Sequence, residues 1–248
     1  MNGKLFWLSI IAVVVSFLGG FLLANALNRN ELNSLRAENE RLAKSENQSN
    51  QSESELSLSV DEIRERIAEA DANPKNVAFQ RNLGLALYRY AAMKQDAELL
   101  AEVARILNRV FESNRQDYVV AVTLGNVLFD IGYFKKDNEQ FQKAREFYQT
   151  ALEQRPNDAD VRTDLGLTYF LTQPPENDAA FREFQKSLQI NPKHEKTLQV
   201  MAQLFLSQNN IGEAEKYIVK LRDVNSTNQF LPQLESQISQ IKNNSQIQ

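Results

Sequence analysis

The sequence predicts an all-α protein, an α-solenoid of about four stacked helix pairs with flanking cap helices, preceded by a transmembrane helix and a short coiled coil. Three observations lead to this prediction. Residues 5–27 contain no charged side chain. Leu-Gly pairs recur at Gly84, Gly125 and Gly166, at an interval of 41 residues. Between these pairs, apolar residues follow the 3-4-3 spacing of a single helix face.

The first thirty residues, 1–30, have the properties of a membrane anchor. The uncharged run would form a helix of roughly 35 Å, enough to cross a bilayer core of about 30 Å. A cleaved signal peptide is the alternative, because Ala24-Asn25-Ala26 resembles a cleavage site, although the apolar run is longer than such peptides use. Because the short N-terminal flank is basic through Lys4, we expect a single span with the C-terminal domain on the extracytoplasmic, periplasmic side of the cell membrane. The side and any cleavage of the anchor stay open.

Two features in and after the span suggest a homodimer. Small residues recur at every fourth position and would let another helix approach closely; they are Ala12, Ser16, Gly20 and Ala24. Residues 31–44 show a short heptad pattern with one polar core position, formed by Leu32, Leu35, Asn39 and Leu42. The alternatives are small residues of no special role and a solvated juxtamembrane helix. Residues 45–59 are polar and are predicted to be a linker.

Repeats organise the rest of the chain, residues 60–248. Turn residues mark one phase of the repeat, at Asn73-Pro74, Pro156-Asn157 and Asn191-Pro192. A second helix face returns after 41 residues: Leu100, Val103, Leu107 and Val110 become Phe141, Ala144, Tyr148 and Ala151. The predicted repeats are 77–116, 118–157, 159–192 and 195–228, with cap helices before residue 77 and at 229–243. The extra residues of the two longer repeats are expected at the hairpin tips, 92–99 and 134–140.

Residues 77–228 resemble the tetratricopeptide repeat family. The best unit reads DADVRTDLGLTYFLT…AAFREFQKSLQINP and places these residues on the family's positions: Leu165, Gly166, Tyr169, Ala180, Phe184 and Pro192. The family's early Trp is missing from every unit. The resemblance implies a right-handed solenoid that binds proteins without catalysis. Gly84, Gly125 and Gly166 are expected to allow close helix crossings, and Gly132 and Gly212 are expected at turns between paired helices.

The composition argues against an enzyme, a cofactor and a nucleic-acid partner. The 248 residues include 28 Lys and Arg, 32 Asp and Glu, one His and no Cys. Without Cys there is no thiolate metal site or Cys nucleophile, and a mixed charge of −4 is not typical of a nucleic-acid binder. His194 is expected to be a solvated turn residue. Asp158 and Asp160 fit a helix N-terminus better than a calcium loop, whose Gly is missing.

In the family, the first helix of each repeat lines a concave groove that holds a partner segment. The matching positions here are Arg81, Leu85, Tyr88, Arg89, Asn126, Phe129, Asp130, Thr163, Leu167, Phe170, Lys196, Gln199 and Gln203. The apolar members could form a groove floor for the anchors of a partner, or they could pack between repeats or under the cap. The carboxylate clamp of some family members is not expected, because Asp160 and Asp164 occupy two of its positions.

Together these observations predict a membrane-anchored scaffold or adaptor that binds another protein or peptide segment. An anchor followed by repeats is similar to bacterial envelope proteins of this family, which include apocytochrome-binding subunits of cytochrome c maturation and anchored co-chaperones. An apocytochrome-binding subunit is therefore one alternative. Another is a structural assembly factor that dimerises through its anchor. The sequence does not identify the partner.

Overall fold

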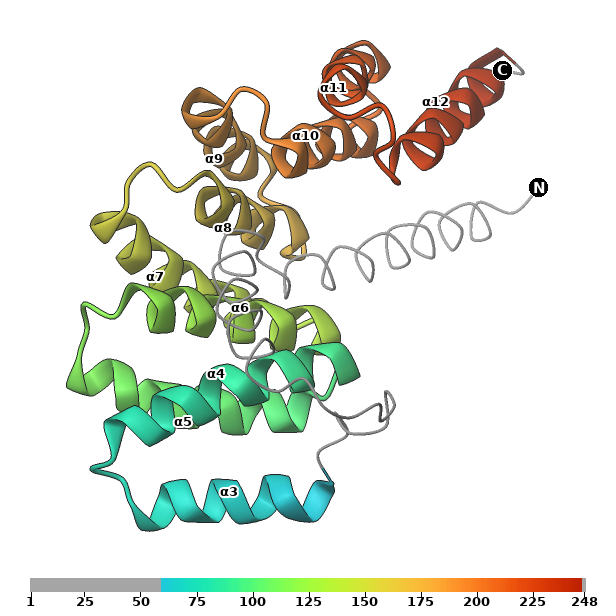
Figure 1. Cartoon of the computed structure of the whole chain (residues 1–248). Helices are drawn as coiled ribbons and strands as arrows, with labels where there is room; N and C mark the ends of the chain where they lie inside the picture. The colour runs from blue at the N-terminus through green and yellow to red at the C-terminus, as the bar shows by residue number, and fades with distance from the viewer. Residues whose placement is uncertain (1–58, 247–248) are drawn as a thin grey trace, which may run out of the picture. The chain divides into compact units, whose positions relative to one another are not determined.

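The computed structural model describes residues 59–246, and every regular element in this range is an α-helix. Ten helices, α3 to α12, follow one another there without an intervening strand (Figure 1). The all-α prediction is therefore confirmed for the described part of the chain. The anchor, the coiled coil and nearly all of the linker lie outside it, and so do Ala12, Ser16, Gly20, Ala24, Leu32, Leu35, Asn39 and Leu42. Within 59–246, no helix combines the length and the apolar character that a membrane crossing requires.

The chain divides into two compact units, residues 1–110 and 111–248, and this division falls inside the predicted repeat 77–116. In the first unit, α3 (Val60–Ala72) and α4 (Val77–Lys94) precede α5 (Ala97–Ser113), whose last residues extend past the division. Local caps explain where two of these helices begin. Ser59 and Glu62 form a capping box at α3, and the side chain of Asn76 accepts a hydrogen bond from the backbone N–H of Phe79 in α4.

Packing in the first unit combines a close helix crossing with a surface ion-pair cluster. A Cβ atom at Gly84 would lie 2.5 Å from Cδ2 of Leu107, so the bare backbone of α4 makes room for this side chain of α5. Asp71, near the end of α3, accepts hydrogen bonds from Arg105 and Arg109 of α5. The hydrogen bonds from these two guanidinium groups hold the pKa of Asp71 below its usual value, at about 2.

The second unit is a stack of three helix pairs followed by a terminal helix. The pairs are α6 (Tyr118–Lys135) with α7 (Asn138–Gln154), α8 (Ala159–Leu171) with α9 (Asn177–Ile190), and α10 (Glu195–Ser207) with α11 (Ile211–Val224). The terminal helix is α12 (Leu231–Gln246). Each helix packs against the next one in the chain, and α8 also contacts α6 and α10. The first helices of the three pairs therefore lie side by side and form one face of the unit.

Side chains that accept backbone hydrogen bonds define where several of these helices start. Asp117, Asp158 and Asn210 each accept a hydrogen bond from the N–H three residues on, at α6, α8 and α11. Asp158 is thus a helix cap, as predicted. Helices α6 and α7 contain 18 and 17 residues, against 13 and 14 for α8 and α9. The extra residues of the longer repeat lengthen both helices of its hairpin.

Two glycines of the second unit allow paired helices to approach closely. A Cβ atom at Gly125 would lie 2.5 Å from Cε1 of Tyr148, and one at Gly166 would lie 2.5 Å from Cε1 of Phe184. Both aromatic side chains are completely buried. The prediction of close crossings at these glycines is confirmed. At each crossing, an aromatic ring of the second helix packs against the backbone of the glycine in the first.

The prediction that Gly132 and Gly212 lie at turns is wrong. Gly132 lies inside α6, four residues before its C-cap, and Gly212 is the second residue of α11. A glycine weakens a helix by only about 1 kcal/mol, so the packing of the hairpin can carry the helix through it.

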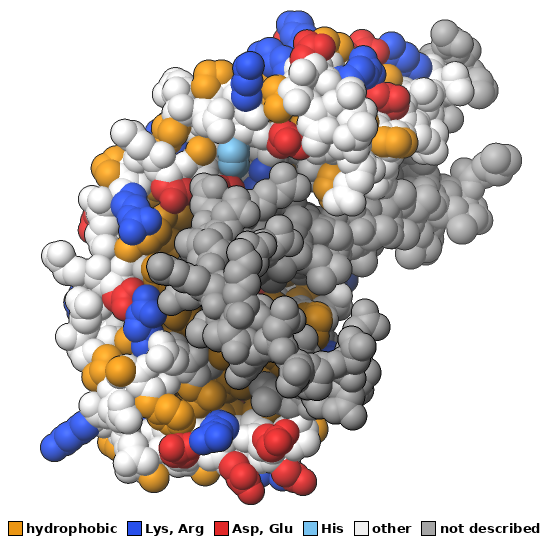
Figure 2. Space-filling view, in the orientation of Figure 1, with side chains coloured by type: hydrophobic (Ala, Val, Ile, Leu, Met, Phe, Trp, Pro, Cys, Tyr) orange, Lys and Arg blue, Asp and Glu red, His pale blue; other side chains and the backbone are white. Residues whose placement is uncertain are grey.

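The terminal helix closes the stack. Its Leu231, Leu234 and Ile238 are buried against an apolar cluster from α10 and α11, which comprises Leu198, Ala202, Ala214, Ile218 and Leu221. At the surface, Lys242 of α12 forms an ion pair of 2.6 Å with Glu215 of α11. Acidic and basic side chains are interspersed at this end of the unit (Figure 2). Helix α12 therefore acts as the apolar-faced, polar-backed cap that the spacing predicts.

Candidate partner-binding face

The groove positions predicted for the second unit lie on the face formed by α6, α8 and α10. Six of them are buried: Asn126, Phe129, Asp130, Thr163, Leu167 and Gln199. Three of them are half-buried: Phe170, Lys196 and Gln203. The last three are therefore the most accessible of the predicted positions on this face. The assignment of the whole set to a groove stays a prediction.

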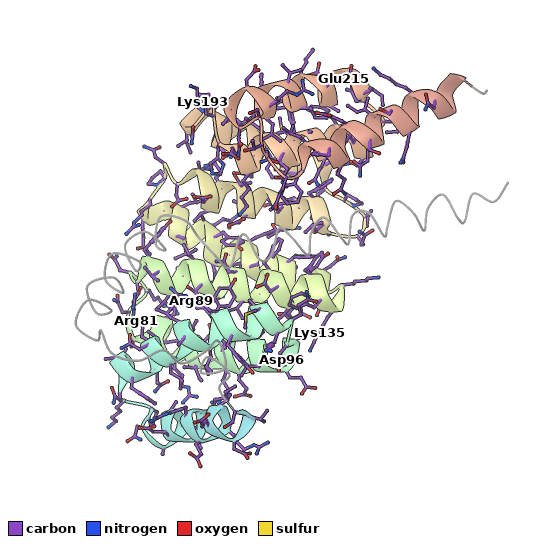
Figure 3. The ribbon with its side chains drawn as sticks, turned by 45° about the vertical axis from the view of Figure 1, so that its right-hand side comes forward. Arg81, Arg89, Asp96, Lys135, Lys193 and Glu215 are labelled. Atoms are coloured by element: carbon purple, nitrogen blue, oxygen red, sulfur yellow. The ribbon has the colours of Figure 1, made fainter. Side chains whose placement is uncertain are left out.

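The groove positions predicted for the first unit lie on α4, which Figure 3 shows with its labelled Arg81 and Arg89. Arg89 is exposed, whereas Arg81 and Leu85 are half-buried and Tyr88 is buried. This helix therefore presents a basic surface, and Leu85 is the partly accessible leucine among the predicted groove positions.

Phe129 belongs to the interior of the first helix pair of this unit. Its ring is 1% exposed and packs edge-on against the ring of Phe141 on α7, with the ring centroids 5.6 Å apart. Nearby, the Tyr148 hydroxyl donates a hydrogen bond of 2.8 Å to Oδ1 of Asn126. These contacts place Phe129 inside its own helix pair, which differs from both the groove floor and the packing between repeats that the sequence leaves open.

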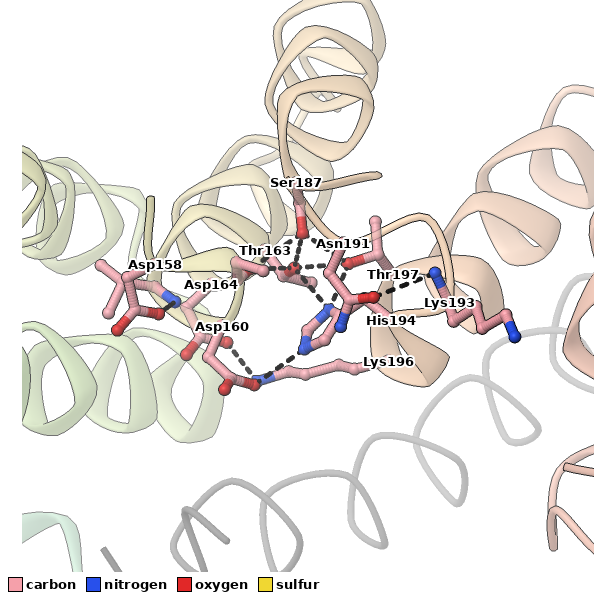
Figure 4. Close-up of polar contacts among 12 residues, drawn as sticks. Asp158, Asp160, Thr163, Asp164, Ser187, Asn191, Lys193, His194, Lys196 and Thr197 are labelled. Carbon is pink, nitrogen blue, oxygen red and sulfur yellow. Dashed lines mark hydrogen bonds and ion pairs between the residues drawn. The ribbon is translucent and has the colours of Figure 1, made fainter. Parts of the chain in front are cut away.

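A buried polar network joins α8, α9 and α10 (Figure 4). The hydroxyl oxygens of Thr163, Ser187 and Thr197 lie between 2.6 and 3.0 Å from one another. Thr163 and Ser187 also donate to the backbone carbonyl of Ala159, at 2.7 and 2.9 Å. All three side chains are completely buried. Hydrogen bonds therefore replace apolar packing at this junction, and their directions fix how the three helices meet.

His194 connects the network to the surface. Its Nδ1 lies 2.6 Å from Oγ1 of Thr197, and its Nε2 lies 3.1 Å from Oδ1 of Asp160. The ring is visible in pale blue in Figure 2, but only 14% of the side chain is exposed. The prediction of a solvated turn histidine is therefore wrong, because the turn folds back onto α8. The hydrogen bond from His194 lowers the pKa of Asp160 even though burial opposes this.

A buried ion pair lies beside the network. Nζ of Lys196 on α10 donates to Oδ1 of Asp164 on α8 at 2.5 Å, and the two side chains are 17% and 5% exposed. Burial raises the pKa of Asp164 to about 6, although the charge of Lys196 opposes the shift. The acids at the two clamp positions are thus both engaged, Asp164 by Lys196 of α10 and Asp160 by His194 in the turn before it.

Gln199 lies one helical turn after Lys196 and is 4% exposed. Its Nε2 is buried and has no hydrogen-bond partner among the described residues. A buried N–H group without an acceptor costs free energy, so an acceptor supplied by another molecule would be favourable here. Gln203, one turn further along α10, is half-buried and extends the same line of amide groups.

Sequence reasoning missed the network, although two substitutions within the repeats signalled it. Thr197 stands one repeat after Val161, and Ser187 stands one repeat after Ala151. Both hydroxyl groups therefore replace apolar side chains at core positions. Only the fold shows that Thr163 and His194 lie beside them.

The face carries no assembled metal site. Among residues 59–246, no three His, Asp or Glu side chains are grouped so as to hold a metal ion. The chemistry that the described residues offer on this face is hydrogen bonding by amides, one buried ion pair and limited apolar contact.

Comparison with known proteins identifies the type of repeat. Residues 125–158, which include most of α6 and all of α7, match the tetratricopeptide repeat family. The structure is similar to that of MamA, with a TM-score of 0.52 at 21% identity, over 66% of this chain and 81% of that chain. It is also similar to TTC0263, described as a thermophilic TPR protein in Thermus thermophilus, with a TM-score of 0.52 at 14% identity over 72% and 96% of the two chains. No curated protein sequence matches the chain. The predicted recognition of tetratricopeptide repeats is confirmed.

Proposed function

We propose that this tetratricopeptide repeat protein is a non-catalytic scaffold that binds an extended segment of another protein on the face of α6, α8 and α10, through side chains of α8 and α10. The observation that carries the proposal is Gln199, whose buried amide nitrogen lacks a partner among the described residues, between half-buried Lys196 and Gln203. A primary amide can donate to one backbone carbonyl and accept from one backbone N–H. Two such side chains on one helix face therefore suit the main chain of an extended peptide.

The neighbouring side chains support a peptide rather than a small charged ligand. Asp164 and Asp160 already pair with Lys196 and His194, so the charges on this face largely compensate one another. Half-buried Phe170 on α8 adds an apolar contact for a side chain of the bound segment. The expected ligand thus binds chiefly through its backbone and one or two apolar side chains.

The proposal also includes attachment to a membrane. Residues 5–27 serve as a single span, and the basic N-terminal flank with Lys4 supports an extracytoplasmic repeat domain. In the full chain, the repeat domain would lie beside the bilayer. A scaffold held there would act on partners that are themselves in or near the membrane.

Site-specific photo-crosslinking in native membranes tests the binding face. A photoreactive residue at Gln203 should form adducts with a partner, and the same residue at exposed Lys216 on α11 should not. Adding Gln199→Leu should reduce the Gln203 adducts, because it removes the amide that we assign to the peptide backbone. Identical adducts from both sites, or none from Gln203, would contradict the proposal.

The absence of Cys makes the sidedness simple to measure. Ser226→Cys places one thiol at an exposed position between α11 and α12. In cells whose outer membrane is permeabilised and whose inner membrane is intact, a membrane-impermeant maleimide should label this thiol. Labelling that requires lysis of the inner membrane would place the repeats in the cytoplasm instead.

The spacing of small residues from Ala12 to Ala24 supports a second role, as an assembly factor that dimerises. Leu35→Cys should then give a disulfide-linked dimer of the full chain in membranes under mild oxidation. Ser45→Cys, outside the heptad pattern, is the matched control. A chain that stays monomeric at native levels would exclude this role without affecting the groove proposal.

A further inference from the structure

We infer that the second unit has another interaction surface, which is lined chiefly by the second helices and binds an extended acidic segment carrying an apolar side chain. It is distinct from the face of α6, α8 and α10. Two hollows define it. One, of about 670 Å³, is lined by Pro156, Arg162, Lys186 and Gln189 among others. The second, of about 250 Å³, is lined by Leu188, Gln189, Leu198, Tyr217 and Lys220 among others. Gln189 borders both, so the hollows are neighbours.

The two hollows are equivalent places in consecutive repeats. Pro156 and Pro192 belong to equivalent turns, 36 residues apart. Arg162 and Leu198 are likewise equivalent positions, each in the first turn of its helix, at the same interval. The second helices contribute Lys186 and Lys220, which are equivalent after 34 residues. The stacking of repeats therefore places similar hollows next to each other, each with a lysine at its edge. They differ at one equivalent position, where the first hollow has the charged Arg162 and the second has the apolar Leu198.

The first hollow has the electrostatics of a carboxylate site. Arg162 and Lys186 share a single carboxylate, that of Glu183, at 3.0 and 2.7 Å. A second terminal nitrogen of Arg162 donates to the backbone carbonyl of Pro156 at 3.0 Å. Its Nε is buried and has no hydrogen-bond partner among residues 59–246. A carboxylate from a partner would satisfy that N–H and balance the second positive charge.

The charge of the linings supports an acidic partner. Of the described residues that line the two hollows, three are basic and none is acidic. The basic side chains are Arg162, Lys186 and Lys220. Exposed Lys186 and Lys220 can reorient toward an incoming carboxylate at little cost, because each is held by at most one partner in the described structure.

The second hollow supplies an apolar anchor point. Leu188, Leu198 and Pro192 form its apolar lining together with the ring of Tyr217. Lys220 lies over that ring, with Nζ 4.9 Å from the centroid, so the positive charge stays at the rim. Neighbouring helices pack roughly 10 Å apart, and an extended chain advances roughly 3.3 Å per residue. The fitting segment therefore carries an Asp or Glu followed by an aliphatic or aromatic side chain about three residues away.

Fluorescence anisotropy with the full chain in detergent micelles tests the surface. The probe is a labelled peptide with one Glu and one Leu, three residues apart, in a Ser, Asn and Gly background. Peptides with Gln in place of Glu, or Ala in place of Leu, are the matched controls. Each control should bind about tenfold more weakly, the scale expected for one charge-assisted contact or one buried side chain. Equal binding of all three peptides would overturn the inference.

Protein variants locate the binding. Lys186→Glu combined with Lys220→Glu should abolish binding, and Lys186→Gln should give a smaller loss in the same direction. Lys216→Glu changes the same charge at an exposed position of α11 outside both linings and should leave the affinity unchanged. Gln199→Leu, which tests the face of α6, α8 and α10, should also leave it unchanged. Loss of binding in Lys216→Glu or Gln199→Leu, or its retention in the double variant, would overturn the inference.

Discussion

Helix α6 and the junction of α8, α9 and α10 are both buried, but they are built in opposite ways. Every residue of α6 from Val120 to Gly132 is buried, and α7 contributes the rings of Phe141 and Tyr148 against it. The junction instead contains three hydroxyl groups, an imidazole and an ion pair. Apolar packing responds to volume, whereas hydrogen bonds respond to direction and to protonation. The two regions should therefore fail under different perturbations.

The largest expected effect tests whether α6 is a packed interior. Phe129→Ala should lower the free energy of unfolding by about 3–5 kcal/mol, because it leaves a cavity beside Phe141. Phe170→Ala, at a half-buried position of α8, should cost less. Urea unfolding of both variants measures the difference. Equal losses of unfolding free energy in the two variants would indicate that Phe129 belongs to the predicted groove floor.

The next effect tests the sensitivity of α6 to added volume. Gly125→Ala should cost about 1–3 kcal/mol, since its Cβ would lie 2.5 Å from the ring of completely buried Tyr148. Gly212→Ala is the control, because a Cβ there meets nothing within 4 Å. That control should be neutral or stabilising by roughly 0.5–1 kcal/mol. A tolerated Gly125→Ala would show that the pair can repack.

A pH dependence should distinguish the junction from α6. The pKa of Asp164 is raised from its ordinary value of 3.8 to about 6, so the folded chain binds this proton more tightly than the unfolded chain. The contribution of Asp164 to stability is therefore largest below pH 4 and declines as the pH rises to 6. Asp164→Asn removes that decline, so its stability relative to the wild type should increase by on the order of 2 kcal/mol across this window.

Unfolding curves at intervals from pH 4 to 7 measure this difference. Gly125→Ala should show a constant offset from the wild type over the same range, because no proton is involved. A constant offset for Asp164→Asn as well would mean that the buried carboxyl titrates normally.

A smaller effect should show that direction matters at the junction. Thr197→Val keeps the shape of the side chain but removes the hydroxyl that meets His194, Thr163 and Ser187. We expect a loss of about 1–2 kcal/mol, because buried partners are left unsatisfied. Thr197→Ser retains the hydroxyl and should lose less of the network. If Thr197→Ser is more destabilising than Thr197→Val, packing contributes more than hydrogen bonding to stability at this position.

The smallest expected effect concerns Asp71, whose contribution to stability should depend on pH in the opposite direction to that of Asp164. Asp71 is an exposed carboxyl whose pKa is lowered to about 2 by Arg105 and Arg109. Its stabilising contribution is present above pH 4 and is lost as the pH falls through 2. Asp71→Asn should cost less than about 1 kcal/mol at neutral pH, and the cost should vanish in acid. A cost that grows in acid would contradict this assignment.

Local patterns predicted much of the fold. Turn residues and caps such as Asp158 mark helix starts, and the glycines at Gly125 and Gly166 mark where a ring lies against the backbone. These features depend on near neighbours in the chain and on one repeated contact. For the same reason, the interpretation of Gly132 as a turn was wrong, because long-range packing can overrule one weak helix former.

The binding face was less predictable. The repeat pattern places Gln199 and Gln203 on the first-helix face, but the burial of Gln199 and its unpaired nitrogen depend on neighbouring helices. His194 was expected to be solvated, because nothing within a few residues indicates that Asp160 faces it across a turn. Exposure and protonation are properties of the surroundings, and no local pattern encodes them.

By itself, the sequence determined that this chain forms paired helices in repeats, because the positions of apolar, small and capping residues act over one or two turns. Only the tertiary structure decided which polar side chains are buried and paired. It also brought residues from the two helices of one repeat, such as Arg162 with Lys186 and Leu198 with Tyr217, into neighbouring hollows. The physical reason is distance: desolvation and charge pairing depend on separations of a few ångströms between residues that lie about twenty positions apart in the chain.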